Sequence, residues 1–247
     1  MRVLLAGEQW TTVGTDVKGF DYVGVNCYHE GGQWLKEALE ARGHQVDYQR
    51  SFEVPRNFPE RLEELQKYQA VILSDIGSNS FLFHPEVLTK SVRRPNRLQL
   101  IKEYVQNGGG LLMIVVWMSF QGIDGRARFH RTPVEEVLPV MCEPTDDRAE
   151  HPEGVFPTTV APNHPLLRGI EGPWPYFLGY NRTIIKPQAE LVLTVNGDPF
   201  LAGNDFGRGR AAVFTTDCSP HWGPHEFMNW RHYATLWDNI VTWLARK

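Results

Sequence analysis

Short, strand-length runs of apolar residues constrain the fold of this chain more than any other feature. Three of them, at 2–6, 70–73 and 111–116, are apolar at nearly every position, and a fourth, at 45–48, is mixed. Continuous apolar runs of this length are typical of strands that are buried on both faces of a parallel sheet. Amphipathic helices are expected between them, over 33–42, 58–65 and 98–105. Strands and helices that alternate in this way predict a doubly wound parallel sheet.

The second half of the chain has a different texture. Ten prolines between residues 133 and 187 interrupt long elements, and short β-like pieces follow at 190–195, 199–202 and 210–215. Asn196-Gly197-Asp198 is a typical hairpin turn between the first two of these pieces. We therefore expect an antiparallel extension of the sheet, a final helix over Tyr233–Leu244, and a single domain over residues 1–247.

Charge and cysteine content exclude several classes of protein. The net charge of −4 provides no basic field for nucleic acid, and the longest apolar run has strand length, so no membrane segment is expected. The three cysteines, Cys27, Cys142 and Cys218, are widely spaced and contain no CxxC motif. This pattern argues against a disulfide framework and for a reducing, cytoplasmic location.

Ligands of open parallel sheets bind outside the carboxyl ends of the strands. We expect four loops at that edge: a polar, Gly-rich loop over 7–28, and loops over 74–84, 117–125 and 217–230. The last loop is the richest in chemically active side chains, which are Asp217, Cys218, His221, Trp222, His225 and Glu226.

Several motifs resemble one known family. They are Gly109-Gly110-Leu111-Leu112-Met113-Ile114 with Trp117-Met118-Ser119-Phe120-Gln121-Gly122, then Thr132-Pro133-Val134-Glu135-Glu136-Val137-Leu138-Pro139, Asn163-His164-Pro165-Leu166-Leu167, and Phe214-Thr215-Thr216-Asp217-Cys218-Ser219-Pro220-His221-Trp222-Gly223-Pro224. Together they resemble the glutamine amidotransferase-like proteins, a branch of the class I glutamine amidotransferase-like fold, over nearly the whole chain. The resemblance implies a flavodoxin-like, three-layer α/β/α sandwich and does not by itself imply a reaction.

The parent family places a cysteine on a sharp, glycine-flanked turn after a strand, and a His-x-Glu pair activates it. The corresponding position here is near Ser119, between bulky neighbours and without a thiol. We therefore predict that free glutamine is not hydrolysed by the family mechanism. His84-Pro85-Glu86 precedes this position, whereas the family order is nucleophile first, and we expect it to open a helix with Pro85 in the first turn.

The candidate catalytic residues are Ser119, His221 and Asp217. Ser119 is a candidate nucleophile or ligand contact, with capping of the next turn as the alternative. His221 is a candidate general base, with a structural role beside Trp222 as the alternative.

Candidate ligand contacts are Asp75, Trp222, Cys27, Cys218, His225 and Glu226. Asp75 also fits an ordinary turn, and Cys218 an inert core position. A metal site from Asp217, His221 and His225 is disfavoured because Gly223 and Pro224 prevent helical presentation. We predict no metal and no cofactor.

Three functions remain open from the sequence. The first is a hydrolase or amidotransferase that uses Ser119 or a cysteine with His221. The second is a non-catalytic domain that binds a small molecule. The third is a homo-oligomeric subunit with its contact in the aromatic, Pro-rich second half. Because their loops leave the same edge of the sheet, Asp75, Ser119, Asp217, His221 and Trp222 are expected to converge on one pocket.

Overall fold

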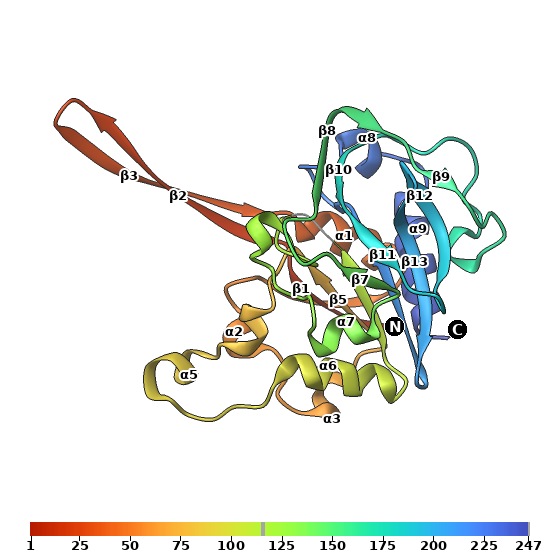
Figure 1. Ribbon diagram of the computed structural model, residues 1–247, viewed down its shortest axis with the longest axis horizontal. Coiled ribbons are helices and arrows are strands. Elements are labelled where there is room, and N and C mark those ends of the chain that lie inside the picture. Colours follow the sequence, from red (N-terminus) through yellow and green to blue (C-terminus); the bar gives the residue numbers. More distant parts are fainter. Residues whose placement is uncertain (115–116, 247) are drawn as a thin grey trace.

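The computed structural model describes residues 1–114 and 117–246 (Figure 1). Its largest element is an eight-stranded sheet with the order β4-β1-β5-β6-β14-β13-β12-β9. Neighbouring strands are parallel from β4 to β14 and antiparallel from β14 to β9. The strands are β1 (Arg2–Gly7), β4 (Gln45–Gln49), β5 (Ala70–Ser74), β6 (Gly110–Ile114), β9 (Thr158–Thr159), β12 (Glu190–Val195), β13 (Asp198–Phe206) and β14 (Gly209–Phe214). The mixed α/β class and the antiparallel extension are as predicted.

The predicted parallel strands are confirmed in β1, β4 and β5, but β4 was wrongly expected to be buried: it is the edge strand, and of its residues only Val46 is buried. Of the fourth run, 111–114 lie in β6, and Val115 and Val116 lie outside the described residues. Every residue of β5 and β6 is buried, which explains why both runs lack the alternation of a half-exposed strand.

Helices pack against the parallel strands in two separate apolar clusters. One cluster joins Val3 and Leu5 of β1 to α1 (Gly32–Glu40) and α9 (Tyr233–Leu244). The other joins Leu4 and Ala6 to α6 (Arg97–Gln106) and α7 (Pro133–Val137). Since successive strand residues point to opposite faces, the two clusters lie on opposite sides of the sheet.

Residues 9–30 form a long antiparallel hairpin that projects far from the body (Figure 1). We call this hairpin the arm; its strands are β2 (Gln9–Lys18) and β3 (Asp21–Glu30), and Gly19 and Phe20 make the turn. The predicted loop over 7–28 was therefore wrong. The segment is polar and Gly-rich because both faces of the arm meet solvent, not because it is irregular.

The helix predicted over 58–65 was also wrong in extent. Helix α2 covers Val54–Asn57, Phe58 is extended with ψ 138°, and α3 covers only Leu62–Leu65. Pro59 explains the break, because a residue before proline is driven out of the helical region. The helix expected at His84-Pro85-Glu86 is confirmed: α5 (Pro85–Lys90) begins there, and the His84 side chain accepts a hydrogen bond from the Glu86 amide.

The Pro-rich segment folds into short ribbons rather than long elements. Strand β7 (Val140–Cys142) pairs with β11 (Thr183–Ile185), and β8 (Arg148–Val155) pairs with β10 (Phe177–Asn181). The remaining helices are α4 (Asn79–Leu82) and α8 (His225–Met228), with single 3₁₀ turns at Ile123–Gly125 and Pro165–Leu167. None of the described helices has both the length and the apolar character needed to cross a membrane.

Candidate functional site

Two acidic residues leave the sheet at the point where its strand order reverses. Glu8 directly follows β1 and Asp75 directly follows β5, its parallel neighbour. Both have left-handed backbones, with φ 51° for Glu8 and 43° for Asp75, which is rare for non-glycine residues and a frequent mark of functional sites. The reversal point of an open parallel sheet is where ligands bind, so these residues define the candidate site.

A buried cluster of acids and hydroxyls forms around Glu8. Its carboxylate accepts hydrogen bonds from the Ser74 hydroxyl and, at 2.9 Å, from the Ser219 hydroxyl. Asp217 Oδ1 accepts the Ser219 amide at 2.8 Å and lies 3.2 Å from the Ser219 hydroxyl oxygen, whose single proton serves either acid. Glu8, Ser74, Asp217 and Ser219 are all fully buried. We call these four residues, with the adjoining Asp75 and Cys218, the carboxyl cluster.

Because Gly31 has no side chain, it leaves room for the Ser219 and Glu8 side chains of this cluster. A Cβ atom at Gly31 would lie 2.5 Å from Ser219 Oγ and 2.7 Å from Glu8 Oε1. The Gly31 amide also donates to the Glu8 carbonyl oxygen at 3.0 Å, so the end of the arm is tied to the residue that precedes it.

Burial and mutual repulsion keep the cluster partly protonated. Burial and then the charge of Asp75 raise the pKa of Glu8 to about 7, against hydrogen bonds from Ser74 and Ser219 that lower it. Burial and then the charge of Glu8 raise the pKa of Asp217 well above its usual value. Burial raises the pKa of the Cys218 thiol in the same way, so Cys218 is a neutral thiol and not a nucleophilic thiolate.

One oxygen of the cluster is left without a partner. Among the described residues, no donor reaches Asp217 Oδ2, although the atom is buried. A buried polar atom without a hydrogen bond is unusual in a folded protein and calls for an explanation such as a ligand or ion. Glu8, Asp217 and Cys218 each offer one ligand atom within 4.8 Å of the others, a set that fits a small cation once the acids ionise.

A partly exposed rim lies over Asp75. Asp75 Oδ1 accepts the Met118 amide at 2.8 Å, and Asp75 itself is half-buried. Next to Met118, the exposed ring of Trp117 meets the exposed ring of His221 edge-on, with ring centres 4.9 Å apart. None of the five surface cavities that we describe, of about 260 to 520 Å³, is lined by the carboxyl cluster.

The three predicted catalytic residues do not form one catalytic unit in the structure. Ser119 is buried and its hydroxyl donates to the Ile114 carbonyl oxygen at 2.9 Å. His221 packs between Trp117 and Trp222, and partial burial of its ring between them lowers its pKa, against the charge of Glu150, which raises it. Among the described hydrogen bonds, none joins Ser119 to His221. Asp217 alone of the three belongs to the carboxyl cluster.

The predicted ligand contacts divide in the same way. Asp75 and Cys218 lie in the carboxyl cluster, whereas the buried Trp222 donates its indole N–H to Glu150 at 2.8 Å. His225 is exposed at the start of α8 beside Trp34, and Glu226 accepts from the Tyr176 hydroxyl.

Cys27 does not belong to the carboxyl cluster, because it is exposed on β3 of the arm. Sequence reasoning missed Glu8, Ser74 and Ser219. Glu8 follows β1 and Ser74 ends β5, and these positions were the available signal, whereas Ser219 lies five residues beyond the end of β14.

Comparisons with known proteins agree with this fold. The cytoplasmic protein STM3548 of Salmonella typhimurium is 43% identical, with a TM-score of 0.96 and full coverage of both chains. The cytoplasmic protein STM1381 of Salmonella typhimurium LT2 is 39% identical, with a TM-score of 0.95 over 99% of both chains. A cold-adapted β-galactosidase from Rahnella sp. R3 shares the fold alone, at 17% identity and a TM-score of 0.51, over 86% of this chain and 26% of that enzyme.

A search of curated proteins found no match. A family model described as "Putative glutamine amidotransferase" matches residues 2–246, in agreement with the resemblance of the motifs. The chain therefore belongs to the glutamine amidotransferase-like family.

Proposed function

We propose that this chain is a small-molecule-binding member of its family. It binds a small cation at the carboxyl cluster, and that cation is either a protonated amine or a metal ion. The observation that carries the proposal is the unpartnered, buried Asp217 Oδ2 beside Glu8. Three acids that repel one another in a buried site ionise together only when a positive charge joins them. An ammonium group or a metal ion provides that charge and satisfies the open oxygen.

The same geometry argues against glutamine hydrolysis. The family chemistry needs a thiolate beside a histidine. Cys142 and Cys218 are buried and burial raises both thiol pKa values, whereas Cys27 lies on the arm. Ser119 Oγ and His221 have other partners. We predict that the purified protein releases no ammonia from glutamine in a coupled assay; ammonia release that is lost in Ser119→Ala or His221→Ala would contradict this.

Ligand binding is tested by thermal denaturation with chlorides of ammonium, methylammonium, Mg²⁺, Mn²⁺ and Zn²⁺, which separate the amine from the metal. Tetramethylammonium, which cannot donate a hydrogen bond, is the control ligand. We expect one class to stabilise the wild type by ~1.4 kcal/mol at ten times its dissociation constant. Asp217→Asn should abolish the effect, and Asp16→Asn on the arm should retain it.

Two results would refute the proposal. One is that no cation stabilises the wild type across the millimolar range. The other is that Asp217→Asn responds as the wild type does, which would place binding elsewhere on the surface.

Proton release gives an independent check. Glu8, with a pKa of about 7, is half-protonated near pH 7, and a bound cation favours its charged form. Titration calorimetry in buffers of different ionisation enthalpy should detect net proton release at pH 7, with roughly half a proton per ligand from Glu8 and a further contribution from Asp217. Uptake of protons would contradict the assignment.

We also propose the finer fold class, a flavodoxin-like three-layer α/β/α sandwich, and a cytoplasmic location. The strand order β4-β1-β5-β6-β14, which is 2-1-3-4-5 in chain order for these five strands, supports the first. The two Salmonella relatives, described as cytoplasmic proteins, support the second.

A further inference from the structure

The arm has two faces of different chemistry. Residues that pair directly across an antiparallel ribbon point to the same side, so the pairs Thr11–Tyr28, Val13–Asn26, Thr15–Gly24 and Val17–Tyr22 share one face. This neutral face carries no charged side chain between Thr11 and Tyr28. The opposite, charged face carries Asp16, Lys18 and Asp21 near the tip.

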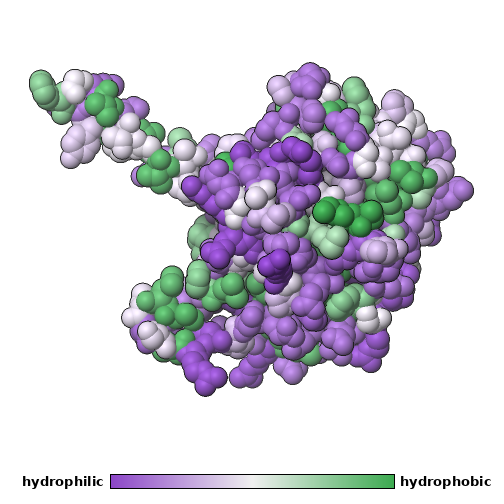
Figure 2. All heavy atoms as spheres, viewed as in Figure 1, coloured by the Kyte–Doolittle hydropathy of each residue, from purple (hydrophilic) through white to green (hydrophobic). Residues whose placement is uncertain are grey.

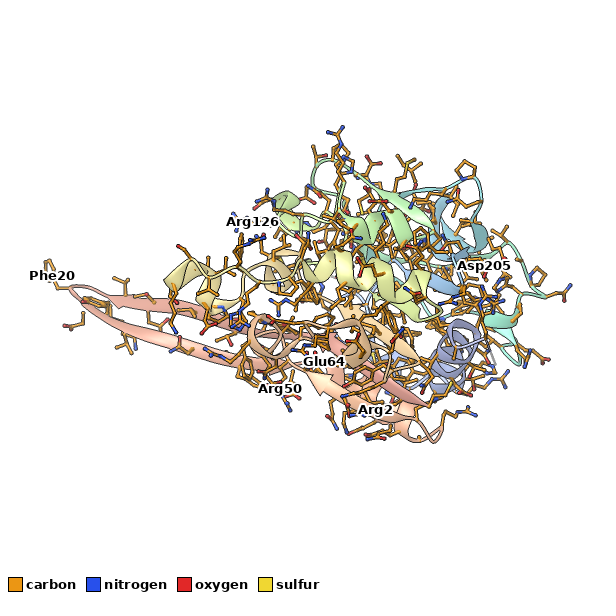
Figure 3. The ribbon with its side chains drawn as sticks, turned by 90° about the horizontal axis from the view of Figure 1, so that it is seen from below. Arg2, Phe20, Arg50, Glu64, Arg126 and Asp205 are labelled. Atoms are coloured by element: carbon orange, nitrogen blue, oxygen red, sulfur yellow. The ribbon has the colours of Figure 1, made fainter. Side chains whose placement is uncertain are left out.

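The body of the molecule leaves the neutral face uncovered. Val13, Val17 and Tyr22 are 76%, 70% and 77% exposed, and Phe20 at the tip is fully exposed. Figure 3 shows Phe20 at the far end of the arm, and Figure 2 shows hydrophobic side chains along the arm and at its tip. None of the described hydrogen bonds joins residues 12–27 to the rest of the chain, and the arm is anchored only at its root, where Glu30 meets Arg50 at 2.9 Å.

The uncovered area is of the size that a protein interface needs. Val13, Val17, Tyr22 and Tyr28 expose on the order of 500 Å², and Phe20 adds roughly 200 Å², since one aromatic side chain offers ~150–250 Å². A standard interface takes ~800 Å² from each partner. An isolated two-stranded ribbon is only marginally stable in water, so packing on a partner would stabilise this arm.

The charge pattern selects the kind of partner. Lys18 is the only lysine or arginine of the arm, and the chain carries a net charge of −4, so anionic membranes and nucleic acids are poor partners. A neutral face can lie against its own copy without opposing like charges. A second copy of the chain is also the one partner present at equal concentration from synthesis onward.

From these observations we infer that the arm is a dimerisation device, and that its neutral face packs on a second copy of this chain about a two-fold axis. The contact is isologous, so each substitution enters the interface twice. The charged face stays in solvent.

Two valines provide a matched test, because both are exposed and lie on opposite faces of the arm. Val17→Lys places a charge on the neutral face, and Val23→Lys places one on the charged face. By sedimentation velocity at ~10 µM, we expect a wild-type dimer, a Val23→Lys dimer and a Val17→Lys monomer, with the dissociation constant raised ~100-fold or more. Tyr22→Ser, which adds no charge, should weaken the dimer in the same direction.

Several outcomes overturn the inference. They are a wild-type monomer, equal effects of Val17→Lys and Val23→Lys, and an assembly that Val17→Lys leaves unchanged. The melting temperature of each variant monomer shows that its body is folded, so loss of the dimer is separated from unfolding.

Discussion

Glu8 combines a left-handed backbone, complete burial and an ionisable side chain, and its carboxylate accepts hydrogen bonds from the Ser74 and Ser219 hydroxyls. Because burial raises its pKa from about 4.5 to about 7, the folded chain holds this proton more tightly than the unfolded chain. The free energy of unfolding therefore falls as the pH rises between those two values. The full difference corresponds to roughly 3 kcal/mol, shared with the acids that interact with Glu8.

Glu8→Gln tests this pH dependence of the free energy of unfolding. The substitution removes the charge and keeps an oxygen for a serine hydroxyl, so we expect the fall in stability between about pH 4.5 and 7 to become shallower. At pH 8 the variant should be more stable than the wild type. Urea denaturation at several pH values gives both quantities, and Glu40→Gln, exposed on α1, is the control. An unchanged slope in Glu8→Gln would show that another group titrates.

Individual residues also show how much of the candidate site could be predicted from the sequence. Asp217, Asp75 and Cys218 could be selected because each follows a recognisable buried strand. Glu8 also follows such a strand. Its contact with Gly31, 23 positions later, could not be predicted, because residues 7–28 were expected to form a loop and not the arm that brings the two residues together. Ser219 donates to an acid 211 positions away, a pairing that no local pattern encodes.

At the scale of elements, burial decides what a pattern reveals. Strands β1, β5 and β6 were predictable because both of their faces are covered and nearly every position is apolar. Strands β2 and β3 were not, because neither face is covered and the pattern contains Thr, Gly and Asp. The prediction of a helix over 58–65 was wrong because Pro59 drives the preceding residue out of the helical region.

The packing of β10 on the 217–224 segment gives a prediction at this scale. A Cβ atom at Gly179 would lie 2.5 Å from the indole nitrogen of Trp222, a fully buried ring that cannot move aside. We expect Gly179→Ala to destabilise the protein by ~1–3 kcal/mol. Gly14→Ala on the arm, where nothing lies within 4 Å, should change stability little. Thermal denaturation compares the two, and equal effects would contradict this packing.

At the scale of the whole molecule, we expect the body to fold without the arm. The sequence placed an oligomer contact in the Pro-rich second half, whereas the most continuous exposed apolar residues lie on the arm. Trp10 and His29 are directly opposed across the ribbon, so Asn-Gly can close the chain between them as a two-residue hairpin turn. We expect a variant with Asn-Gly in place of residues 11–28 to keep the far-ultraviolet spectrum of its body and to be monomeric in light scattering. A dimer of this variant would place the contact on the body.

The junction of the arm with the body has a consequence for how such proteins diverge. The Gly31 amide and the Glu8 carbonyl oxygen are 3.0 Å apart, so the body presents two adjacent ends between which the hairpin is inserted. A hairpin keeps its pairing only when both strands lengthen together, so the insertion grows or shrinks by two residues at a time. Each step moves the tip by about 3.4 Å. Related chains should therefore differ in this segment by even numbers of residues, and the reach of their arms should change in fixed increments while the strands of the body keep their register.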